Sequence, residues 1–448
     1  MAFTTADLQR LLGKLPSSSC YWVAYSGGRD SHVLLHAMAV LKYQLGATLR
    51  AVHINHGLQP AAAGWESHCL AICENLGVPL EVIRLALTPK RGDSLEAVAR
   101  EGRYRAIRQL IAEGDLLLTA HHQDDQAETV LLQLLRGAGP AGLAAMPRLD
   151  RFGVGYRARP LLDFSRDELA SYAAEHQLNW VEDATNLDPA FDRNYLRSEI
   201  LPRLQSRRPG VARAISRSAA HCGESHALVE AQAAEDLKEL SGRLAGTLDI
   251  PRLSLLPRGR VRAVLRYWIV SSGFSLPNTV KLNSIIDEVM AADEERTPLL
   301  QWPGVEIRRY RRDLYLMVPL VDVDAAAVEV VEQGLRWRLS PGMGEFRLQE
   351  GEGGIDPGLL GGAELQIRYH HLSNRLHLQG RSHSTRFKNF YQERGVPPWM
   401  RGRLPLLYSG DQLVAVADLV ICHPFGVARG ERGLLPNWVR GPESISSE

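Results

Sequence analysis

Apolar and polar positions change in blocks along the first half of the chain, and these blocks predict strands and helices in alternation. Short apolar runs, typical of buried strands, are each followed by a longer segment with the spacing of an amphipathic helix. The apolar runs lie at 20–25, 49–55, 78–85 and 115–119. Strands that alternate with helices of this length favour a parallel sheet covered on both faces, which is a doubly wound α/β domain.

The pattern changes after about residue 217. A long helical stretch is followed by a second amphipathic helix, a strand hairpin, and then short β-like runs between glycine-rich turns that one further helix interrupts. The helical stretch lies at 221–240, the second helix at 261–268, the hairpin at 305–310 and 314–318, and the last helix at 387–394. The sequence therefore predicts three domains: the doubly wound domain (1–217), a mainly helical domain (218–322) and a small mixed α+β domain (325–448).

The composition of the chain indicates the compartment in which we expect the protein. The chain has 448 residues, of which 45% are hydrophobic and 23% charged, as expected for a globular protein of two or three domains. No uncharged apolar run approaches the ~20 residues that span a bilayer, and the N-terminus lacks the basic head and apolar core of a secretion signal. Five scattered cysteines form no disulfide framework. These features predict a reduced, cytoplasmic protein with no membrane partner.

The net charge of only +1 conceals two strongly basic segments. Residues 193–217 contain seven arginines against one acid, and residues 368–403 contain eight lysines and arginines against one acid. We call these the first and second basic stripes. Local stripes of this kind are typical of polyanion-binding surfaces, although each on its own is also compatible with a solvated face.

A candidate phosphate-binding loop, Ser26 to Ser31, follows the first predicted strand and opens the first helix. Its glycines, Gly27 and Gly28, allow close approach of the backbone to an anion, and the start of a helix offers unpaired N–H groups. A Walker-type loop requires Gly-Lys-Ser/Thr, which the chain lacks. A G-x-G-x-x-G match at 137–142 follows a helix rather than a strand, which excludes the dinucleotide-binding interpretation. The alternative is a serine-glycine turn without a ligand.

The sequence Ser-Gly-Gly-x-Asp-Ser in this position resembles the PP-loop of the ATP pyrophosphatase superfamily, whose members cleave ATP between the α and β phosphates and adenylate a substrate. Further segments are similar to the tRNA(Ile)-lysidine synthetase family, in its longer, three-domain form. These segments lie at 53–58, 96–104, 121–129 and 192–197, and more loosely at 387–390 and 395–399. The resemblance is close from residue 21 to about residue 224.

The resemblance implies a two-step reaction on a tRNA(Ile) with a CAU anticodon. ATP adenylates O2 of the wobble cytidine, and the ε-amine of free L-lysine then attacks C2 and expels AMP. The product, lysidine, pairs with A rather than G, so the codon that is read changes from AUG to AUA. ATP and Mg²⁺ are the implied cofactors, and tRNA(Ile) and lysine are the implied partners.

The residues in the similar segments suit this chemistry. We expect ATP phosphates to bind the loop, arginines to stabilise the developing negative charge, and a carboxylate to accept the proton of the lysine amine. The loop residues are Ser26, Gly27, Gly28, Arg29, Asp30 and Ser31, and the arginines are Arg100, Arg103, Arg193 and Arg197. Asp125 is the first candidate for the lysine amine and Asp30 the second, and either carboxylate is a candidate ligand of Mg²⁺.

Further residues are candidate substrate contacts. These are His56, His122, Asp124, Glu128 and Asn194, together with Arg381, Arg386 and Lys388 of the second basic stripe. A structural role as a helix N-cap is an equal alternative for Asp124, and structural hydrogen bonding is an alternative for the histidines. The cysteines offer no zinc-ligand spacing.

Three other interpretations compete with this one. A tRNA sulfur transferase of the same superfamily would require reactive cysteines, whereas Cys69 and Cys73 lie on the apolar face of a predicted helix. A non-catalytic tRNA-binding protein would be expected to carry damage in the phosphate loop or at Asp124 and Asp125, which are intact. A synthetase acting on a small molecule would not require the two basic stripes.

Overall fold

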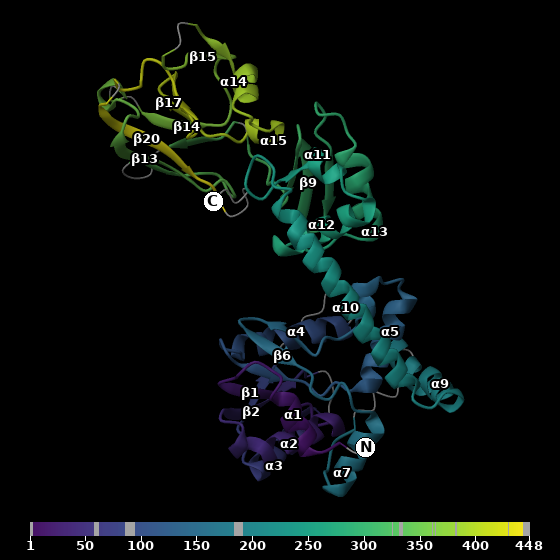
Figure 1. The fold of residues 1–448 in the computed structure, drawn as a ribbon. Coiled ribbons are helices and arrows are strands. Elements are labelled where there is room, and N and C mark those ends of the chain that lie inside the picture. Colours follow the sequence, from purple (N-terminus) through teal and green to yellow (C-terminus); the bar gives the residue numbers. More distant parts are fainter. Residues whose placement is uncertain are drawn as a thin grey trace. The chain divides into compact units, whose positions relative to one another are not determined.

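A computed structural model describes residues 3–57, 62–85, 95–182, 191–324, 326–330, 335–360, 362, 364–380, 383–428 and 430–441. The chain divides into two compact units, Met1–Leu228 (unit 1) and Val229–Glu448 (unit 2). Figure 1 shows the elements of each unit along the chain. In the described part of the chain, no helix is long and apolar enough to cross a membrane.

Unit 1 is built on a six-stranded sheet in the order β3-β2-β1-β4-β6-β5. The strands are β1 (Cys20–Ala24), β2 (Thr48–Asn55), β3 (Leu80–Arg84), β4 (Leu116–Leu118), β5 (Leu149–Phe152) and β6 (Gly155–Ala158). All neighbours are parallel except β5 and β6, which form an antiparallel hairpin at one edge. The four strands predicted in this part of the sequence are confirmed as β1 to β4.

Helices cover both faces of this sheet, as a doubly wound fold requires. They are α1 (Thr5–Leu12), α2 (Arg29–Leu41), α3 (Ala62–Leu76), α4 (Leu95–Leu110), α5 (Gln123–Leu135), α6 (Pro140–Leu143) and α7 (Arg166–Glu175). Successive strand residues point to opposite faces. Val23 and Leu118 therefore belong to the core beneath α1, α2, α3 and α7, whereas Trp22 and Leu117 pack with Ile107 of α4 on the other face.

Short helical segments carry the first basic stripe. They are α8 (Asp192–Tyr195), a π-helical turn (Leu196–Ile200) and α9 (Leu201–Arg207), and they lead into the long helix α10 (Val211–Lys238). Leu201 and Ala212 pack against Ala127 of α5, which anchors this segment to the helix that follows β4. The helix predicted at 221–240 is part of α10.

The first part of unit 2 combines helices with a four-stranded antiparallel sheet in the order β7-β10-β9-β8. The strands are β7 (Leu248–Asp249), β8 (Leu299–Trp302), β9 (Val305–Tyr310) and β10 (Asp313–Met317), and the helices are α11 (Ile250–Ser254), α12 (Arg258–Ser271), α13 (Thr279–Ser284) and a π-helical turn (Ile285–Met290). The predicted hairpin is confirmed as β9 and β10. Leu265 and Trp268 of α12 pack with Ile307 and Leu314 of the sheet.

The second part of unit 2 is rich in short strands. One sheet has the order β11-β14-β17-β18-β19, another has the order β12-β13-β20, and β15 and β16 form a separate hairpin. The strands are β11 (Val328–Val330), β12 (Arg336–Arg338), β13 (Glu345–Glu352), β14 (Leu365–Arg368), β15 (Arg375–Leu376), β16 (Thr385–Arg386), β17 (Leu406–Ser409), β18 (Gln412–Val416), β19 (Val420–Ile421) and β20 (Arg432–Val439). The helices are α14 (Phe387–Glu393), which confirms the last predicted helix, and α15 (Pro398–Arg401).

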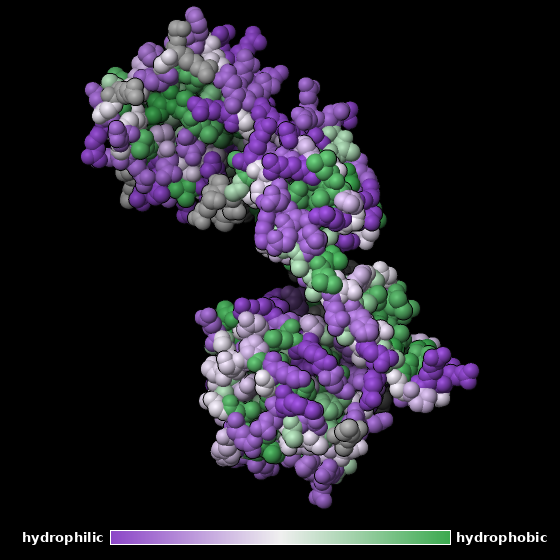
Figure 2. All heavy atoms as spheres, viewed as in Figure 1, coloured by the Kyte–Doolittle hydropathy of each residue, from purple (hydrophilic) through white to green (hydrophobic). Residues whose placement is uncertain are grey.

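Unit 2 contains two large apolar cores. One extends from Ala233 to Leu314 and the other from Trp337 to Trp438. We therefore still propose three domains with boundaries at about residues 218 and 325, of which the last two lie mostly in unit 2. In the view of Figure 2, hydrophilic residues dominate the surface of each unit. Smaller apolar areas are scattered among these hydrophilic residues.

Candidate active site

The candidate phosphate loop connects β1, at the centre of the sheet, to α2. Gly27 has φ of 86°, and Gly28 is the extended N-cap residue of α2 and provides no side-chain cap. The loop is closed by its serines, because Ser31 Oγ donates to the carbonyl of Gly28 (2.8 Å) and accepts the N–H of Ser26 (3.2 Å). The first turn of a 13-residue helix thus presents N–H groups at a parallel strand end, which is a favourable place for an anion.

The loop is held from behind by a segment that follows α7. The N–H of Val181 donates to the carbonyl of Gly27 (3.0 Å), and the Nδ1 atom of His32 lies 2.8 Å from the carbonyl oxygen of Asn179. A Cβ atom on Gly27 would lie 2.9 Å from Cγ2 of Val181 and 3.1 Å from Sγ of Cys69. Gly27 is therefore required both by its positive φ and by close packing, whereas a Cβ on Gly28 would meet only Ser26 Oγ, at 3.5 Å.

The second part of the site is the start of α5, at the end of β4. His122 is the N-cap residue, its Nδ1 atom lies 3.2 Å from the backbone nitrogen of Asp124, and the carboxylate of Asp125 accepts the N–H of His122 (3.1 Å). The N-cap is thus His122 rather than Asp124. The Asp124 carboxylate instead accepts the N–H of Arg166 (2.9 Å) and so ties the start of α7 to the start of α5.

The His122 ring joins the two loops. Its Nε2 atom lies 3.5 Å from a carboxylate oxygen of Asp30 and 3.4 Å from one of Asp125. Because β1 and β4 are parallel neighbours, the segments that follow them meet at the same edge of the sheet. Burial would raise the pKa of Asp30, but the hydrogen bond and charge of His122, followed by Arg29, lower this pKa to about 2. The charge of His122 likewise outweighs burial and lowers the pKa of Asp125.

Two arginines of the first basic stripe complete the cluster. Arg197 donates from Nε to Glu128 (2.6 Å) and from Nη2 to Asp125 (2.9 Å), and Arg193 donates from Nε to the other oxygen of Glu128 (2.8 Å). The Glu128 side chain is fully buried (0% exposed), while those of Arg193 and Arg197 are 29% and 25% exposed. Spacing of four residues places both arginines on one helical face. Glu128 thus fixes two partly exposed guanidinium groups beside the Asp125 carboxylate.

Neutral histidines lie at the neighbouring strand ends. Arg103 donates to Nε2 of His56 (2.7 Å from Nη2), and burial, followed by the charge of Arg103, lowers the pKa of His56 to about 4. Burial also lowers the pKa of His121 to about 4, and Nδ1 of His121 lies 3.0 Å from the Thr119 hydroxyl. The Arg100 guanidinium lies over the Tyr104 ring, 5.4 Å from its centroid. Arg103 and His56 therefore form a hydrogen-bonded pair.

The remaining predicted site residues, taken together with Asp30, fall into three groups. Asp30, His122, Asp125, Glu128, Arg193 and Arg197 lie in one cluster, which Asp124 supports from the backbone. The carbonyl of Asn194 accepts the Ser198 hydroxyl within the same helical segment. Arg386 and Lys388 are exposed residues of unit 2, and Arg381 lies outside the described residues.

Two supports of the site carry no signal in the sequence that links them to it. Arg166 contributes its N–H to Asp124, and its guanidinium lies 4.0 Å from Glu128. It opens α7 within a capping box of Ser165 and Glu168, a pattern that marks a helix start but not what the helix faces. Val181, which packs on Gly27, belongs to no motif.

Among the residues described, no group of three or more His, Cys, Asp or Glu side chains is arranged to hold a metal ion.

An anion-binding loop after the central strand, with carboxylates and arginines at the same sheet edge, defines a nucleotide-binding α/β enzyme of the PP-loop class. Residues 3–204 match the PP-loop domain family, residues 248–315 the TilS substrate binding domain, and residues 365–438 the TilS substrate C-terminal domain. The chain belongs to the tRNA(Ile)-lysidine synthase family.

Similar proteins cover nearly the whole chain. A tRNA(Ile)-lysidine synthase of Coxiella burnetii is 42% identical over 96% of this chain and 95% of that protein. The corresponding protein of Methylococcus capsulatus is 40% identical over 90% of this chain and 92% of its own length. A solved U34-tRNA thiolase of Methanococcus maripaludis covers 48% of this chain and 77% of its own, with 20% identity and a TM-score of 0.42.

The two loop glycines are expected to respond differently to alanine. Gly28→Ala should keep the unfolding temperature of the wild type, because its Cβ meets no close neighbour, but should abolish ATP–pyrophosphate exchange in the presence of tRNA by blocking phosphate approach. Gly27→Ala should also lower the unfolding temperature, because a left-handed non-glycine residue costs ~1–2 kcal/mol and this one lacks space. Near-normal exchange by a folded Gly28→Ala protein would contradict the assignment of the phosphate loop.

The cluster also predicts a pH dependence of stability. Burial alone would lower the pKa of His122, but the surrounding carboxylates, led by Asp125, raise it to about 10 from 6.5 in the unfolded chain. The contribution of His122 to stability is therefore full below pH 6.5 and is lost as the pH rises through about 10. In metal-free buffer, the unfolding temperature of the wild type should fall more steeply across this range than that of His122→Gln. Parallel curves would mean that His122 is neutral.

Proposed function

We propose that this protein ligates free L-lysine to C2 of the wobble cytidine of a tRNA(Ile) with a CAU anticodon. ATP is consumed, AMP and pyrophosphate are released, and the codon that is read changes from AUG to AUA. The observation that carries the proposal is the convergence of the phosphate loop, two carboxylates and two arginines at one sheet edge, in a chain of the tRNA(Ile)-lysidine synthase family. tRNA and free lysine meet in the cytoplasm, which is therefore the proposed compartment.

The first step joins the cytidine O2 to the α phosphorus of ATP and releases pyrophosphate. Negative charge grows on the phosphate oxygens, so preorganised donors at this place lower the barrier. The N–H groups at the start of α2 and the hydroxyls of Ser26 and Ser31 are such donors. Arg193 and Arg197 are held by Glu128 and keep part of their surface exposed, which leaves donors for a phosphate.

Mg²⁺ is the proposed ion of this step. It is usually bound by one or two carboxylates together with substrate phosphates, and it neutralises charge on the phosphates. Asp30 fits this role because it is part of the phosphate loop itself, has its pKa lowered to about 2, and lies near the same His122 Nε2 atom as the carboxylate of Asp125. Asp125 is the second candidate ligand.

The second step forms the bond between lysine Nε and cytidine C2 and breaks the bond from C2 to the adenylate oxygen, so that AMP leaves. The ammonium of lysine must first lose a proton, and an ionised carboxylate can hold the ammonium and accept that proton. We assign this role to Asp125, which lies outside the phosphate loop and is held in place by Arg197 and His122. The His56–Arg103 pair and Arg100 remain candidate contacts to the nucleotide or the cytidine.

The two cysteines that lie close together in the sequence do not support the sulfur-transfer alternative. Cys69 and Cys73 are buried, with 0% and 1% of their surface exposed, and burial raises the pKa of each thiol to about 12. A nucleophilic cysteine requires a thiolate near neutral pH and access to the substrate.

Mass spectrometry of the wobble cytidine after incubation of tRNA(Ile), ATP and lysine with the protein tests the proposal. A mass gain of one lysine residue is expected, and an unmodified cytidine would refute it.

The two carboxylates should separate the two steps. Asp125→Asn is expected to retain adenylation of tRNA and to lose at least tenfold in lysine transfer, because an amide cannot accept the proton. Asp30→Asn also removes one charge beside His122. This variant should lose adenylation itself, and its activity should depend more strongly on added Mg²⁺ than the activity of Asp125→Asn. The measurements are incorporation of label from [α-³²P]ATP into tRNA and of labelled lysine. If both steps fell equally in Asp125→Asn, its role would be in binding the ion.

A further inference from the structure

We propose that the second part of unit 2 contains a pocket for one unpaired nucleotide of the substrate RNA, with the base inserted among aromatic side chains and the phosphate bound by a pair of arginines. This inference rests on the proposed function, because it assumes that the substrate is a tRNA. It concerns a part of the chain that takes no part in the chemistry described above, and it assigns a ligand to a site within the second basic stripe.

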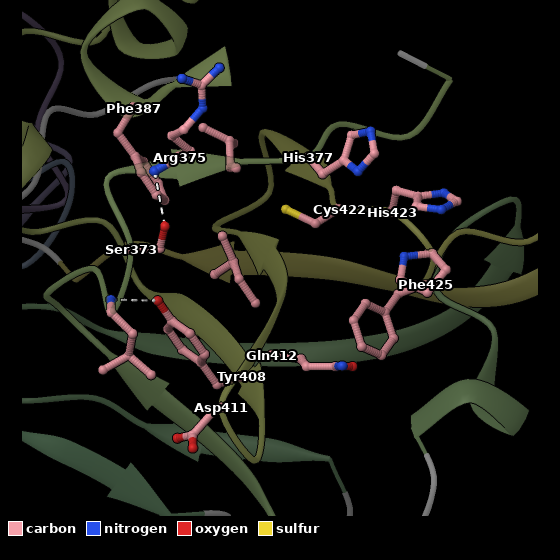
Figure 3. A pocket seen from close by; sticks show the side chains of 14 residues that line it. Ser373, Arg375, His377, Phe387, Tyr408, Asp411, Gln412, Cys422, His423 and Phe425 are labelled. Carbon is pink, nitrogen blue, oxygen red and sulfur yellow. Dashed lines mark hydrogen bonds between the residues drawn. The ribbon is translucent and has the colours of Figure 1, made fainter. Parts of the chain in front are cut away.

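The pocket has a volume of about 260 Å³ and lies between β15, α14, β17 and the segment after β19 (Figure 3). Phe387, Tyr408, Cys422 and Phe425 are buried residues of its lining. Figure 2 shows apolar surface in the region of β15 and β17, bordered by hydrophilic surface. The volume is below the ~300–1,000 Å³ of pockets for drug-sized ligands, which favours a single flat ring system.

The rim offers groups that recognise a base. The rings of His377 and His423 lie with centroids 5.0 Å apart, and both residues are exposed. Imidazole and aromatic faces stack on nucleobases, and this requires a base that is not already stacked within a helix. The Gln412 amide, which forms no hydrogen bond with another described residue, offers both a donor and an acceptor to a base edge.

A second, independent observation indicates an anion beside this pocket. Arg375 of β15 and Arg386 of β16 are direct partners across the two-stranded hairpin. Like charges in this position destabilise a strand pair. Arg375 donates to the hydroxyl (2.8 Å) and carbonyl (3.0 Å) of Ser384, and no described carboxylate forms an ion pair with either arginine. A phosphate between the two guanidinium groups would relieve this repulsion and use donors well matched to it.

The two features are adjacent in the chain and in space. Arg375 lines the pocket itself, and Arg386 directly precedes Phe387, whose ring is part of the lining. An aromatic pocket directly beside a phosphate site fits a nucleotide better than either feature alone would. A gap left by packing would not require two facing arginines, and a simple basic surface for duplex phosphates would not require a pocket. The geometry therefore favours a single-stranded nucleotide.

The experiment is chemical probing of base edges in tRNA(Ile) bound to the full-length protein, with dimethyl sulfate for A and C and a carbodiimide for G and U. The variants are His423→Ala for the base and Arg375→Ala and Arg386→Ala for the phosphate. Arg432→Ala, an exposed arginine of the same unit that does not line the pocket, is the matched control for loss of one charge. The substituted residues are exposed, and equal unfolding temperatures check that each variant folds.

We expect one unpaired nucleotide outside the anticodon loop to be protected by the wild type and by Arg432→Ala, and to become reactive in His423→Ala. tRNA binding by His423→Ala should weaken at least fivefold, the lower range for loss of a stacked base. Each variant of the arginine pair should reduce the slope of log affinity against log salt by ~0.7–0.9, beyond any change in Arg432→Ala. A shortened tRNA that lacks its single-stranded 3′ end distinguishes a terminal nucleotide from a loop nucleotide.

The same reactions are assayed for lysidine at saturating tRNA. Lysidine formed by all variants, together with an identical protection pattern in wild type and His423→Ala, would refute the pocket and leave the proposed function intact. Absence of lysidine with the wild-type protein would instead refute the proposed function. Protection that is lost in His423→Ala while the rate at saturating tRNA is unchanged would support the pocket as a binding site remote from the chemistry.

Discussion

The candidate site depends on the contact of one imidazole ring with two carboxylates that follow different strands. Asp30 begins the helix after β1, and His122 and Asp125 begin the helix after β4. Because β1 and β4 are parallel neighbours, their carboxyl ends meet, and the His122 ring bridges the two loops. If another strand lay between β1 and β4, the width of a strand would separate the groups. The order of strands in the sheet is therefore the constraint on which the chemistry depends.

Opposite charges in this cluster are paired before any substrate binds. Three carboxylates (Asp30, Asp125 and Glu128) contact three cationic groups (His122, Arg193 and Arg197), and Arg29, Asp124 and Arg166 add further charges at its edge. Leaving one buried charge without its partner is costly, so each member keeps the others ionised and in place. In the proposed reaction every ligand brings charge to this cluster: ATP brings negative charge, whereas Mg²⁺ and the ammonium of lysine bring positive charge. A preorganised cluster of this kind stabilises changes in charge without large rearrangement.

Much of this arrangement is predictable from the sequence because it depends on local patterns. Apolar runs and helical spacing determine β1 to β4 and the helices that follow, so the doubly wound fold is read directly from periodicity. The phosphate loop is equally local, since Gly27 and Gly28 lie between one strand and one helix. The same holds for the hairpin of β9 and β10. The partition of the later chain was harder to predict, because its strands are short and pair over long separations.

Tertiary structure alone decided which groups meet. The sequence by itself determined the fold class, the loop and the identity of the charged residues, because each of these depends on neighbours within a few positions. It did not determine that His122 rather than Asp124 caps α5, that Glu128 is buried between two arginines, or that Val181 closes on Gly27. The last two contacts join residues about 65 to 154 positions apart, and they exist only because the sheet order and helix packing bring distant segments to one edge.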